Sequence, residues 1–315
     1  MTEDEFVYDL FDDEKLPYKQ LSVHDEENAE IKDSINLSCV AFIDILGFKE
    51  MIKNDIDKVI LALRYIKLFR ESYCRLPSTG YVGELQNFLP EATMFSDSIV
   101  LSHTIDFDFD FYAFVTALAE LQITLLREGI TVRGGVEIGN LYHDDCFVFG
   151  DGLVSAYLLE KDTAKYPRIV VGEKLFAEVE RQFDKGLERR FENKGVSKNW
   201  RDYENIALSF ISTDRDGVKY INYFRYGFSE LNTFDMKNVF WDEQIDSAER
   251  FYSDTVKPIA EIIKSKLATE KDEGVMEKYM WLKTAFNEML NIYINRSHGG
   301  KSARYKRLWA DRFIE

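Results

Sequence analysis

The sequence contains little of what builds disulfide frameworks, zinc sites or membrane spans. Among 315 residues only Cys39, Cys74 and Cys146 are cysteines, and they are widely spaced with no CxxC or Cys/His pattern. This usage fits a reducing cytoplasm. No apolar run approaches the ~18 residues of a membrane span, and the N-terminus is acidic where a signal peptide is basic. We therefore expect a cytoplasmic protein that is neither exported nor inserted in a membrane.

Positive charge is also in short supply. The chain has 40 Lys and Arg against 56 Asp and Glu, a net charge of −16. An acidic surface repels both a nucleic-acid backbone and an anionic membrane, so neither is an expected partner. A locally basic or metal-neutralised pocket stays compatible with this balance. The 45% hydrophobic content is enough for a sizeable core.

The composition and the hydrophobic pattern of the sequence change along the chain and predict three parts. Residues 1–36 are rich in Asp and Glu and are expected to form an acidic arm. Residues 37–228 alternate apolar strand-like and helix-like segments and are expected to form the main domain. Residues 229–315 are expected to form a helical C-terminal extension, because the chain is almost wholly helical in pattern from about residue 242.

The order of elements within the main domain predicts its architecture. A buried strand, "LSCVAFIDIL", is followed by helices, a hairpin with "FSDS" at its tip, a long apolar helix, and the strand "ITVRGGVEIGNLY". A short strand, a helix, a strand and a further helix complete the set. This order predicts an α+β fold of the ferredoxin-like kind, with a mainly antiparallel sheet and helices packed on one face.

Two aspartates stand out in this arrangement. Asp44 interrupts the apolar strand "VAFIDILGF" near its C-terminal end, and Asp97 occupies the hairpin tip. Either residue alone is more often a cap, but in this topology both project at the same edge of the sheet. Neighbouring carboxylates repel each other unless divalent cations lie between them. With the turn at Gly47 beside a helix N-terminus, the pattern fits a triphosphate bound through two Mg²⁺ or Mn²⁺ ions.

Four ordered motifs resemble the catalytic domain of the class III nucleotidyl cyclases. They are "FIDILGF", "MFSDSIVLS", "VRGGVEIGNLY" and "FGDGLVSAYLLE" followed by "YPRIVV", and they cover about half of the chain. The resemblance implies a homodimer with active sites between the protomers. It also implies that Asp44, Asp97 and the carbonyl of Ile45 hold two metal ions, while a 3′-hydroxyl attacks the α-phosphate and releases pyrophosphate.

Departures from the family narrow the expected substrate. Thr93 stands where adenylyl cyclases have a purine-reading lysine, and Phe147 stands at the second base-reading position. Val154 and Leu158 replace the Asn and Arg that position the ribose and stabilise the transition state. The variant pattern is similar to the bacterial pyrimidine cyclases of antiphage defence (Pycsar). We therefore expect a uridylate cyclase acting on UTP, with CTP as the alternative.

The remaining candidate residues have competing interpretations. Phe42 lies on the same strand face as Asp44 and contacts either the base or the core; Gly47 and Phe48 are expected at the substrate. Arg133 matches an arginine of the family and either reaches phosphate or pairs with an acid such as Glu137. A non-catalytic nucleotide-binding module is the alternative from another functional class. A diguanylate cyclase is disfavoured because "GGDEF" is absent.

Overall fold

The computed structural model describes residues 35–72, 90–106, 109–181, 210–229, 252–296 and 313–314. The compact unit of the chain begins at Ile35. The predicted acidic arm, residues 1–36, therefore lies almost wholly outside the described residues.

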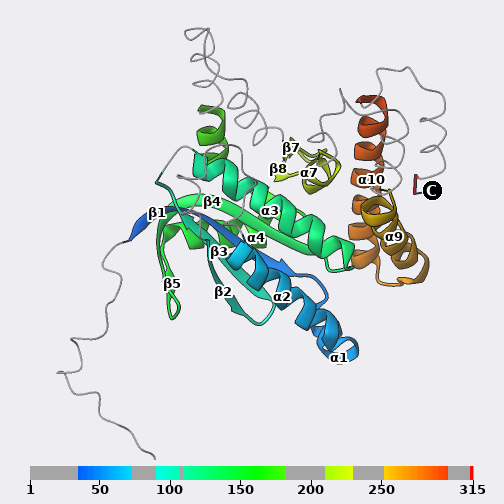
Figure 1. Ribbon diagram of the computed structural model, residues 1–315, viewed down its shortest axis with the longest axis horizontal. Helices are drawn as coiled ribbons and strands as arrows, with labels where there is room; N and C mark the ends of the chain where they lie inside the picture. The colour runs from blue at the N-terminus through cyan, green and yellow to red at the C-terminus, as the bar shows by residue number, and fades with distance from the viewer. Residues whose placement is uncertain are drawn as a thin grey trace, which may run out of the picture. The chain divides into compact units, whose positions relative to one another are not determined.

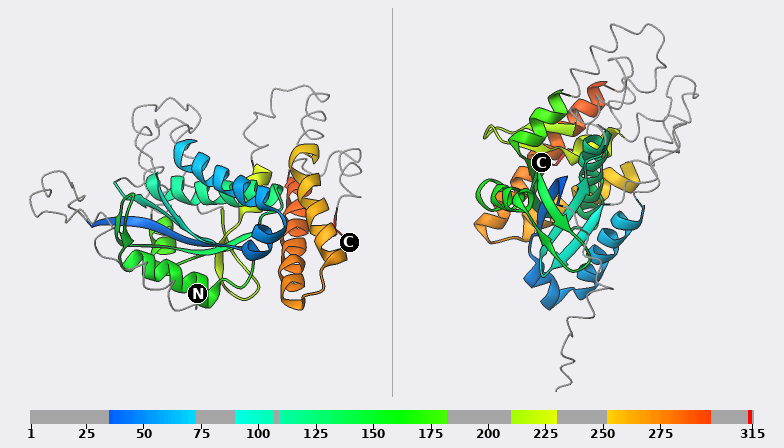
Figure 2. Two further views of the ribbon diagram at one scale, coloured as in Figure 1. Left: turned by 90° about the horizontal axis from the view of Figure 1, so that it is seen from below. Right: turned by 90° about the vertical axis from the view of Figure 1, so that its left-hand side faces the viewer.

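The core of the fold is an eight-stranded sheet, shown with its helices in Figures 1 and 2. Its order is β2-β3-β1-β4-β6-β8-β7, and β5 pairs with β4. Among the described strands only β4 and β6 pair in parallel. The strands are β1 (Asn36–Ile45), β2 (Glu91–Phe95), β3 (Ser98–Thr104), β4 (Val132–His143), β5 (Val148–Phe149), β6 (Ile169–Val171), β7 (Ile211–Thr213) and β8 (Lys219–Ile221).

Seven α-helices have described bounds. They are α1 (Phe48–Asn54), α2 (Ile56–Ser72), α3 (Phe109–Arg127), α4 (Asp151–Thr163), α7 (Tyr223–Ser229), α9 (Lys257–Thr269) and α10 (Glu273–Arg296). A π-helical turn, Tyr252–Val256, leads directly into α9, and residues 173–181 are also helical. The predicted α+β fold, the antiparallel-rich sheet and the C-terminal helices are confirmed.

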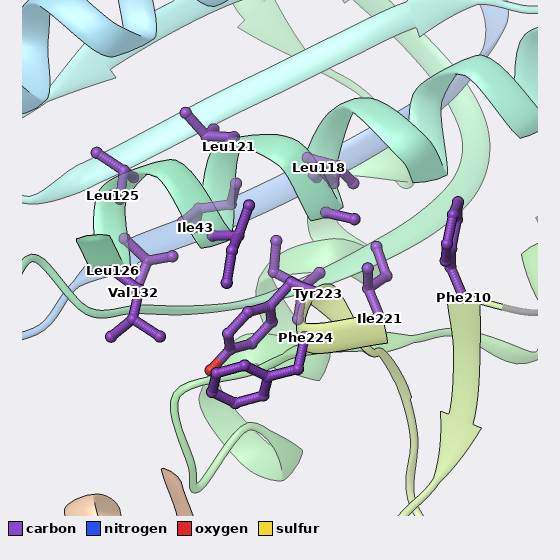
Figure 3. Packing of buried hydrophobic residues seen from close by; sticks show 14 of the residues in the cluster. Ile43, Leu118, Leu121, Leu125, Leu126, Val132, Phe210, Ile221, Tyr223 and Phe224 are labelled. Carbon is purple, nitrogen blue, oxygen red and sulfur yellow. The ribbon is translucent and has the colours of Figure 1, made fainter. Parts of the chain in front are cut away.

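The first four strands and the helices between them have the ferredoxin-like arrangement. In the order β2-β3-β1-β4, every neighbouring pair is antiparallel. Alternate residues of β1, including Ala41 and Ile43, enter the main hydrophobic cluster together with Leu118 and Leu125 of α3. Figure 3 shows this packing between the sheet, α3 and α7. The sheet face under α2 and α3 is therefore covered by buried apolar side chains.

The other face of the sheet carries α4, so helices lie on both faces rather than on one. Val40 and Phe42, the alternate residues of β1, form a second cluster with Ala156 of α4. Two glycines of β4 allow this close approach. A Cβ on Gly135 would lie 2.4 Å from the Ala156 carbonyl oxygen, and one on Gly139 would lie 2.5 Å from the Gly152 Cα. Gly135 and Gly139 of "VRGGVEIG" thus serve helix-to-sheet packing.

The C-terminal helices share the main core. Ile259 and Ile263 of α9 and Leu282 and Phe286 of α10 belong to the same hydrophobic cluster as the sheet. The Phe286 ring meets that of Phe224 in α7 edge to face, with centroids 5.9 Å apart. Burial of these side chains is what holds α9 and α10 against the sheet domain.

Arg168 fastens α10 to the sheet by polar contacts. Its side chain is fully buried and pairs with Asp214 and Asp216 in the turn between β7 and β8. The Nε1 of Trp281 in α10 donates to the same Asp214 carboxylate over 2.6 Å. The guanidinium also lies 5.2 Å from the Tyr166 ring centroid and 6.0 Å from that of Trp281. One buried cation therefore links three distant segments.

Candidate active site

The site is organised around Asp44, near the C-terminal end of β1. In the strand register, Asp44 lies opposite Ser98 of β3 on one side and Arg133 of β4 on the other. Its side chain is 20% exposed. The backbone N–H of Ile45 donates to the Asp97 carbonyl over 2.9 Å, so the hairpin tip is tied directly to the residue after Asp44. The structure thus brings the two aspartates to the same end of the sheet.

The hairpin tip is a two-residue turn. Phe95 pairs with Ser98, which leaves Ser96 and Asp97 as the loop. Ser96 has a φ of +58°, in the left-handed region that such tight hairpins require. The turn predicted at "FSDS" is present. Because the loop has only two residues, Asp97 lies directly beside the end of β1.

Arg133 meets two carboxylates. Its Nε lies 3.4 Å from Oδ2 of Asp44 and 2.9 Å from Oε1 of Glu160 in α4. Its Nη1 donates to the carbonyl of Ala164 over 3.4 Å, just beyond the end of α4. Of the two interpretations of Arg133, the structure shows pairing with acids, but Glu137 is not the partner.

Glu137 has a different task. Its Oε1 accepts from the backbone N–H of Leu175 over 2.7 Å, and its Oε2 accepts from that of Lys174 over 3.2 Å. It therefore caps the N-terminus of the helix at 173–181, where free backbone N–H groups favour a carboxylate.

Glu160 is the site residue that sequence reasoning missed. Its side chain is only 7% exposed, yet it carries a charge toward Arg133. Neither Arg133 Nε nor Glu160 Oε1 makes a hydrogen bond of good geometry within the described part of the chain. The sequence held one signal for it. Glu160 is an acid in the α4 stripe that contains Ala156, the residue packed on the sheet.

Two acids of the site, Asp44 and Glu160, have pKa values above their ordinary range. Burial raises the pKa of Asp44 above its ordinary value; Arg133 opposes this rise and the charge of Asp97 adds to it. Burial likewise raises the pKa of Glu160, again opposed by Arg133 and reinforced by Asp44. Among the described residues, three carboxylates, Asp44, Asp97 and Glu160, thus surround Arg133, and an added cation would offset the excess negative charge.

The donor atoms suit a hard divalent cation. Carboxylates and backbone carbonyls are the oxygen ligands that Mg²⁺ and Mn²⁺ prefer, and Asp44, Asp97 and the Ile45 carbonyl are the groups that would provide them. The described residues contain no group of three or more His, Cys, Asp or Glu side chains that could hold a metal ion by themselves. The protein's own ligands would thus be few, and a bound phosphate would complete the shell.

The other predicted substrate residues lie in different surroundings. Gly47 has a φ of +74°, which a residue with a side chain rarely adopts, so the turn after Asp44 requires glycine. Phe48 is 8% exposed and belongs to the main hydrophobic cluster. Phe42 is equally buried, and its ring lies 5.3 Å from that of Tyr157 and 6.4 Å from that of Phe95.

The two positions expected to read the base differ in exposure. Thr93 Oγ1 lies 2.8 Å from Nε2 of His143, whose Nδ1 lies 2.6 Å from Ser102 Oγ. The Thr93 hydroxyl is thus already oriented by a buried histidine at the end of β4. Phe147 sits in the turn between β4 and β5 and is 65% exposed.

Apolar side chains are exposed around α4. Val154 is 57% exposed and Leu158 is 45% exposed, one helical turn apart on α4. Other large exposed apolar residues near them in the chain or the sheet are Phe95, Phe147, Phe149 and Tyr157. Within the described ranges, no helix has the length and apolar character needed to cross a membrane.

Comparisons with known proteins find weak likenesses only. No protein-family model and no curated protein matches the chain. The solved adenylyl cyclase CyaB from P. aeruginosa is 14% identical, with a TM-score of 0.36 over 47% of this chain and 82% of that one. The guanylyl cyclase Cya2 is 14% identical, with a TM-score of 0.30 over 46% and 79%. A bacterial light-regulated adenylyl cyclase is 17% identical, with a TM-score of 0.29 over 47% and 45%. Likenesses of this size identify neither a substrate nor a reaction.

Proposed function

We propose that the chain is a metal-dependent pyrimidine nucleotide cyclase that converts UTP to 3′,5′-cyclic UMP and pyrophosphate in the cytoplasm. The observation that carries this proposal is the meeting of Asp44 and Asp97 at one sheet end, beside the Arg133–Glu160 pair. Excess negative charge at that point favours a metal-bound polyphosphate as the ligand.

Each residue of the site has a role in this reaction. Asp44, Asp97 and the Ile45 carbonyl would hold two Mn²⁺ or Mg²⁺ ions. When bound, such ions acidify the 3′-hydroxyl and neutralise charge on the leaving pyrophosphate. Arg133 offers its guanidinium to a phosphate oxygen, and Glu160 keeps that group in place. The new bond joins the 3′-oxygen to the α-phosphorus, the bond to pyrophosphate breaks, and the hydroxyl proton leaves to solvent.

The choice of a pyrimidine is supported by the residues at the base-reading positions. Thr93 is short and its hydroxyl is positioned by His143, which leaves one small polar contact where adenylyl cyclases use a lysine. The same chemistry on CTP is the alternative, because a threonine hydroxyl both donates and accepts a hydrogen bond.

Product analysis tests the proposal directly. The purified protein is incubated with ATP, GTP, CTP or UTP and Mn²⁺, and cyclic monophosphates are identified by mass spectrometry. We expect cyclic UMP from the wild type and none from Asp44→Asn or Asp97→Asn. Product from ATP alone would overturn the pyrimidine assignment, and the absence of any cyclic product would overturn the cyclase. Protection of bacteria from phage by the wild type but not by Asp44→Asn would support a second messenger for defence.

A homodimer is part of the proposal, and α4 supplies its surface. Val154, Leu158 and Phe149 leave apolar area in water beside the site, which association of two copies would bury. Light scattering should give twice the mass of the chain for the wild type and one mass for Leu158→Glu. Leu63→Glu, on the exposed side of α2, is the matched control and should remain a dimer.

A non-catalytic nucleotide-binding module is the second candidate. It is favoured by Val154 and Leu158, which are apolar where the resembled family has groups that position the ribose and stabilise the transition state. If Asp44→Asn and Asp97→Asn left the defence phenotype intact while nucleotide binding persisted, this candidate would replace the cyclase.

A further inference from the structure

The C-terminal helix α10 places a lysine where an apolar residue is expected. Its buried stripe includes Leu282, Ala285 and Met289, which are 0%, 8% and 7% exposed. On a helical wheel Lys278 falls within this stripe, four residues before Leu282 and seven before Ala285. It is only partly exposed. A lysine in an apolar stripe costs free energy to desolvate unless its charge has a use.

The residues on both sides of Lys278 fix its direction. Glu277 accepts from Lys165 Nζ over 2.7 Å and from the Tyr166 hydroxyl over 3.2 Å. Tyr279 forms a side-chain hydrogen bond with Thr131, whose carbonyl accepts from the N–H of Leu46 over 2.9 Å. Lys278 is thus held between the segment that follows α4 and the segment that precedes Arg133, at the sheet end where β1 stops.

Figures 1 and 2 both show α10 standing beside that end of the sheet. Lys278 is one of the charged groups close enough to Asp44 to act on it electrostatically. No carboxylate within the described residues forms an ion pair with Lys278. The described residues therefore leave the ammonium group available to a bound anion.

We propose that Lys278 is a substrate-binding residue that α10 delivers to the active site, where its ammonium group binds the polyphosphate of the nucleotide. The inference rests on the proposed function for the identity of the nucleotide. Binding of a polyphosphate anion by Lys278 does not depend on that proposal. Arg133 supplies a planar guanidinium from the sheet, whereas Lys278 supplies a mobile point charge from the extension. Together they add two positive charges to a site where two aspartates and a triphosphate outweigh the charge of two divalent ions.

Calorimetric titration with inorganic triphosphate in Mn²⁺ tests this assignment without turnover. We expect Lys278→Met to raise the Kd for triphosphate about tenfold or more, and Lys278→Arg to restore most of the affinity. Lys264→Met, on the exposed side of α9, is the matched control and should bind as the wild type does. Methionine matches lysine in length, so the folded state should persist, as thermal unfolding would verify.

The outcomes separate this inference from the cyclase proposal. Wild-type affinity in Lys278→Met, or no binding of triphosphate by the wild type, would overturn the role of Lys278. Binding that depends on Lys278 in a protein that forms no cyclic product from any nucleotide would support Lys278 and overturn the cyclase. In an active enzyme, Lys278→Met should raise KM for UTP and weaken product inhibition by pyrophosphate by similar factors.

Discussion

Nε of Arg133 lies 2.9 Å from Oε1 of Glu160, and this contact joins the first strand after α3 to the helix on the opposite sheet face. Glu160 is nearly inaccessible to solvent, so its charge acts on Arg133 with little screening. The pair fixes the direction of the one arginine that faces Asp44. It is a positioning contact whose removal should affect activity more than folding.

Glu160→Gln should therefore lower kcat about tenfold or more, because an amide holds the guanidinium less firmly than a carboxylate does. The measurement is steady-state cyclic-nucleotide formation at saturating Mn²⁺. Glu173→Gln, an exposed glutamate at the start of the next helix, is the control and should retain full activity. Activity of Glu160→Gln within twofold of the wild type would contradict the positioning role.

Asp44→Asn should abolish activity and yet stabilise the fold at neutral pH by up to about 1 kcal/mol. Burial raises the folded-state pKa of Asp44 above its ordinary value of 3.8. The folded state then binds the proton more tightly than the unfolded state, so the contribution of Asp44 to stability falls as pH rises from 3.8 through the raised pKa. Asparagine does not titrate and avoids this loss.

Denaturant unfolding across pH checks that sign. The advantage of Asp44→Asn should be present at pH 7 and disappear below pH 3.8, where the aspartate is protonated in both states. Glu180→Gln, at an exposed position, is the control variant. An advantage that grows as pH falls would disprove the assignment.

Glu137→Ala should lower the free energy of unfolding by about 1–2 kcal/mol, because the N–H groups of Lys174 and Leu175 would lose their shared acceptor. Glu137 in β4 and Glu160 in α4 are both buried acids, so they form a matched pair. The activity per folded molecule should be unchanged in Glu137→Ala and reduced in Glu160→Gln. Equal losses of activity in both would show that burial, rather than contact with Arg133, determines the effect.

Arg168→Ala should destabilise the protein by about 3–5 kcal/mol, because it leaves Asp214 without its buried counter-charge and empties the space between aromatic rings. Arg215→Ala, in the same turn, removes an exposed pair with Glu288 and should cost less than about 1 kcal/mol. Chemical denaturation of the two variants provides the comparison. A similar loss of unfolding free energy in the two variants would mean that Arg168 is exposed to solvent in solution.

The sequence predicted those features that depend on local pattern. The apolar continuity of β1, the tight turn before Asp97 and the amphipathic order of helices each follow from spacing and turn chemistry, and the structure contains them. The proximity of Asp44 and Asp97 followed from strand order alone, since neighbouring strands bring their ends together.

The rest depended on contacts between segments far apart in the chain. The partner of Arg133 is Glu160 rather than Glu137, because α4 crosses the sheet at Gly135 and so places Glu160 above the arginine. Helices on both faces were missed for the same reason: no periodicity reveals which face a helix covers. In the sequence, Arg168 and Lys278 resemble ordinary surface charges. Their surroundings become apparent only in the folded structure, where Arg168 is buried among aromatic rings and carboxylates.

The Arg168 cluster also has a consequence for synthesis of the chain. Tyr220 and Trp281, which both face its guanidinium, are separated by about sixty residues. At about 5–20 residues per second, a ribosome needs about 3 to 12 seconds to pass from one to the other. During that interval we expect the Arg168 guanidinium to lack the cover of Trp281, and the site to lack the lysine proposed to bind polyphosphate. Asp44, Asp97, Arg133 and Glu160 are thus synthesised well before helices α9 and α10, which pack in the same core.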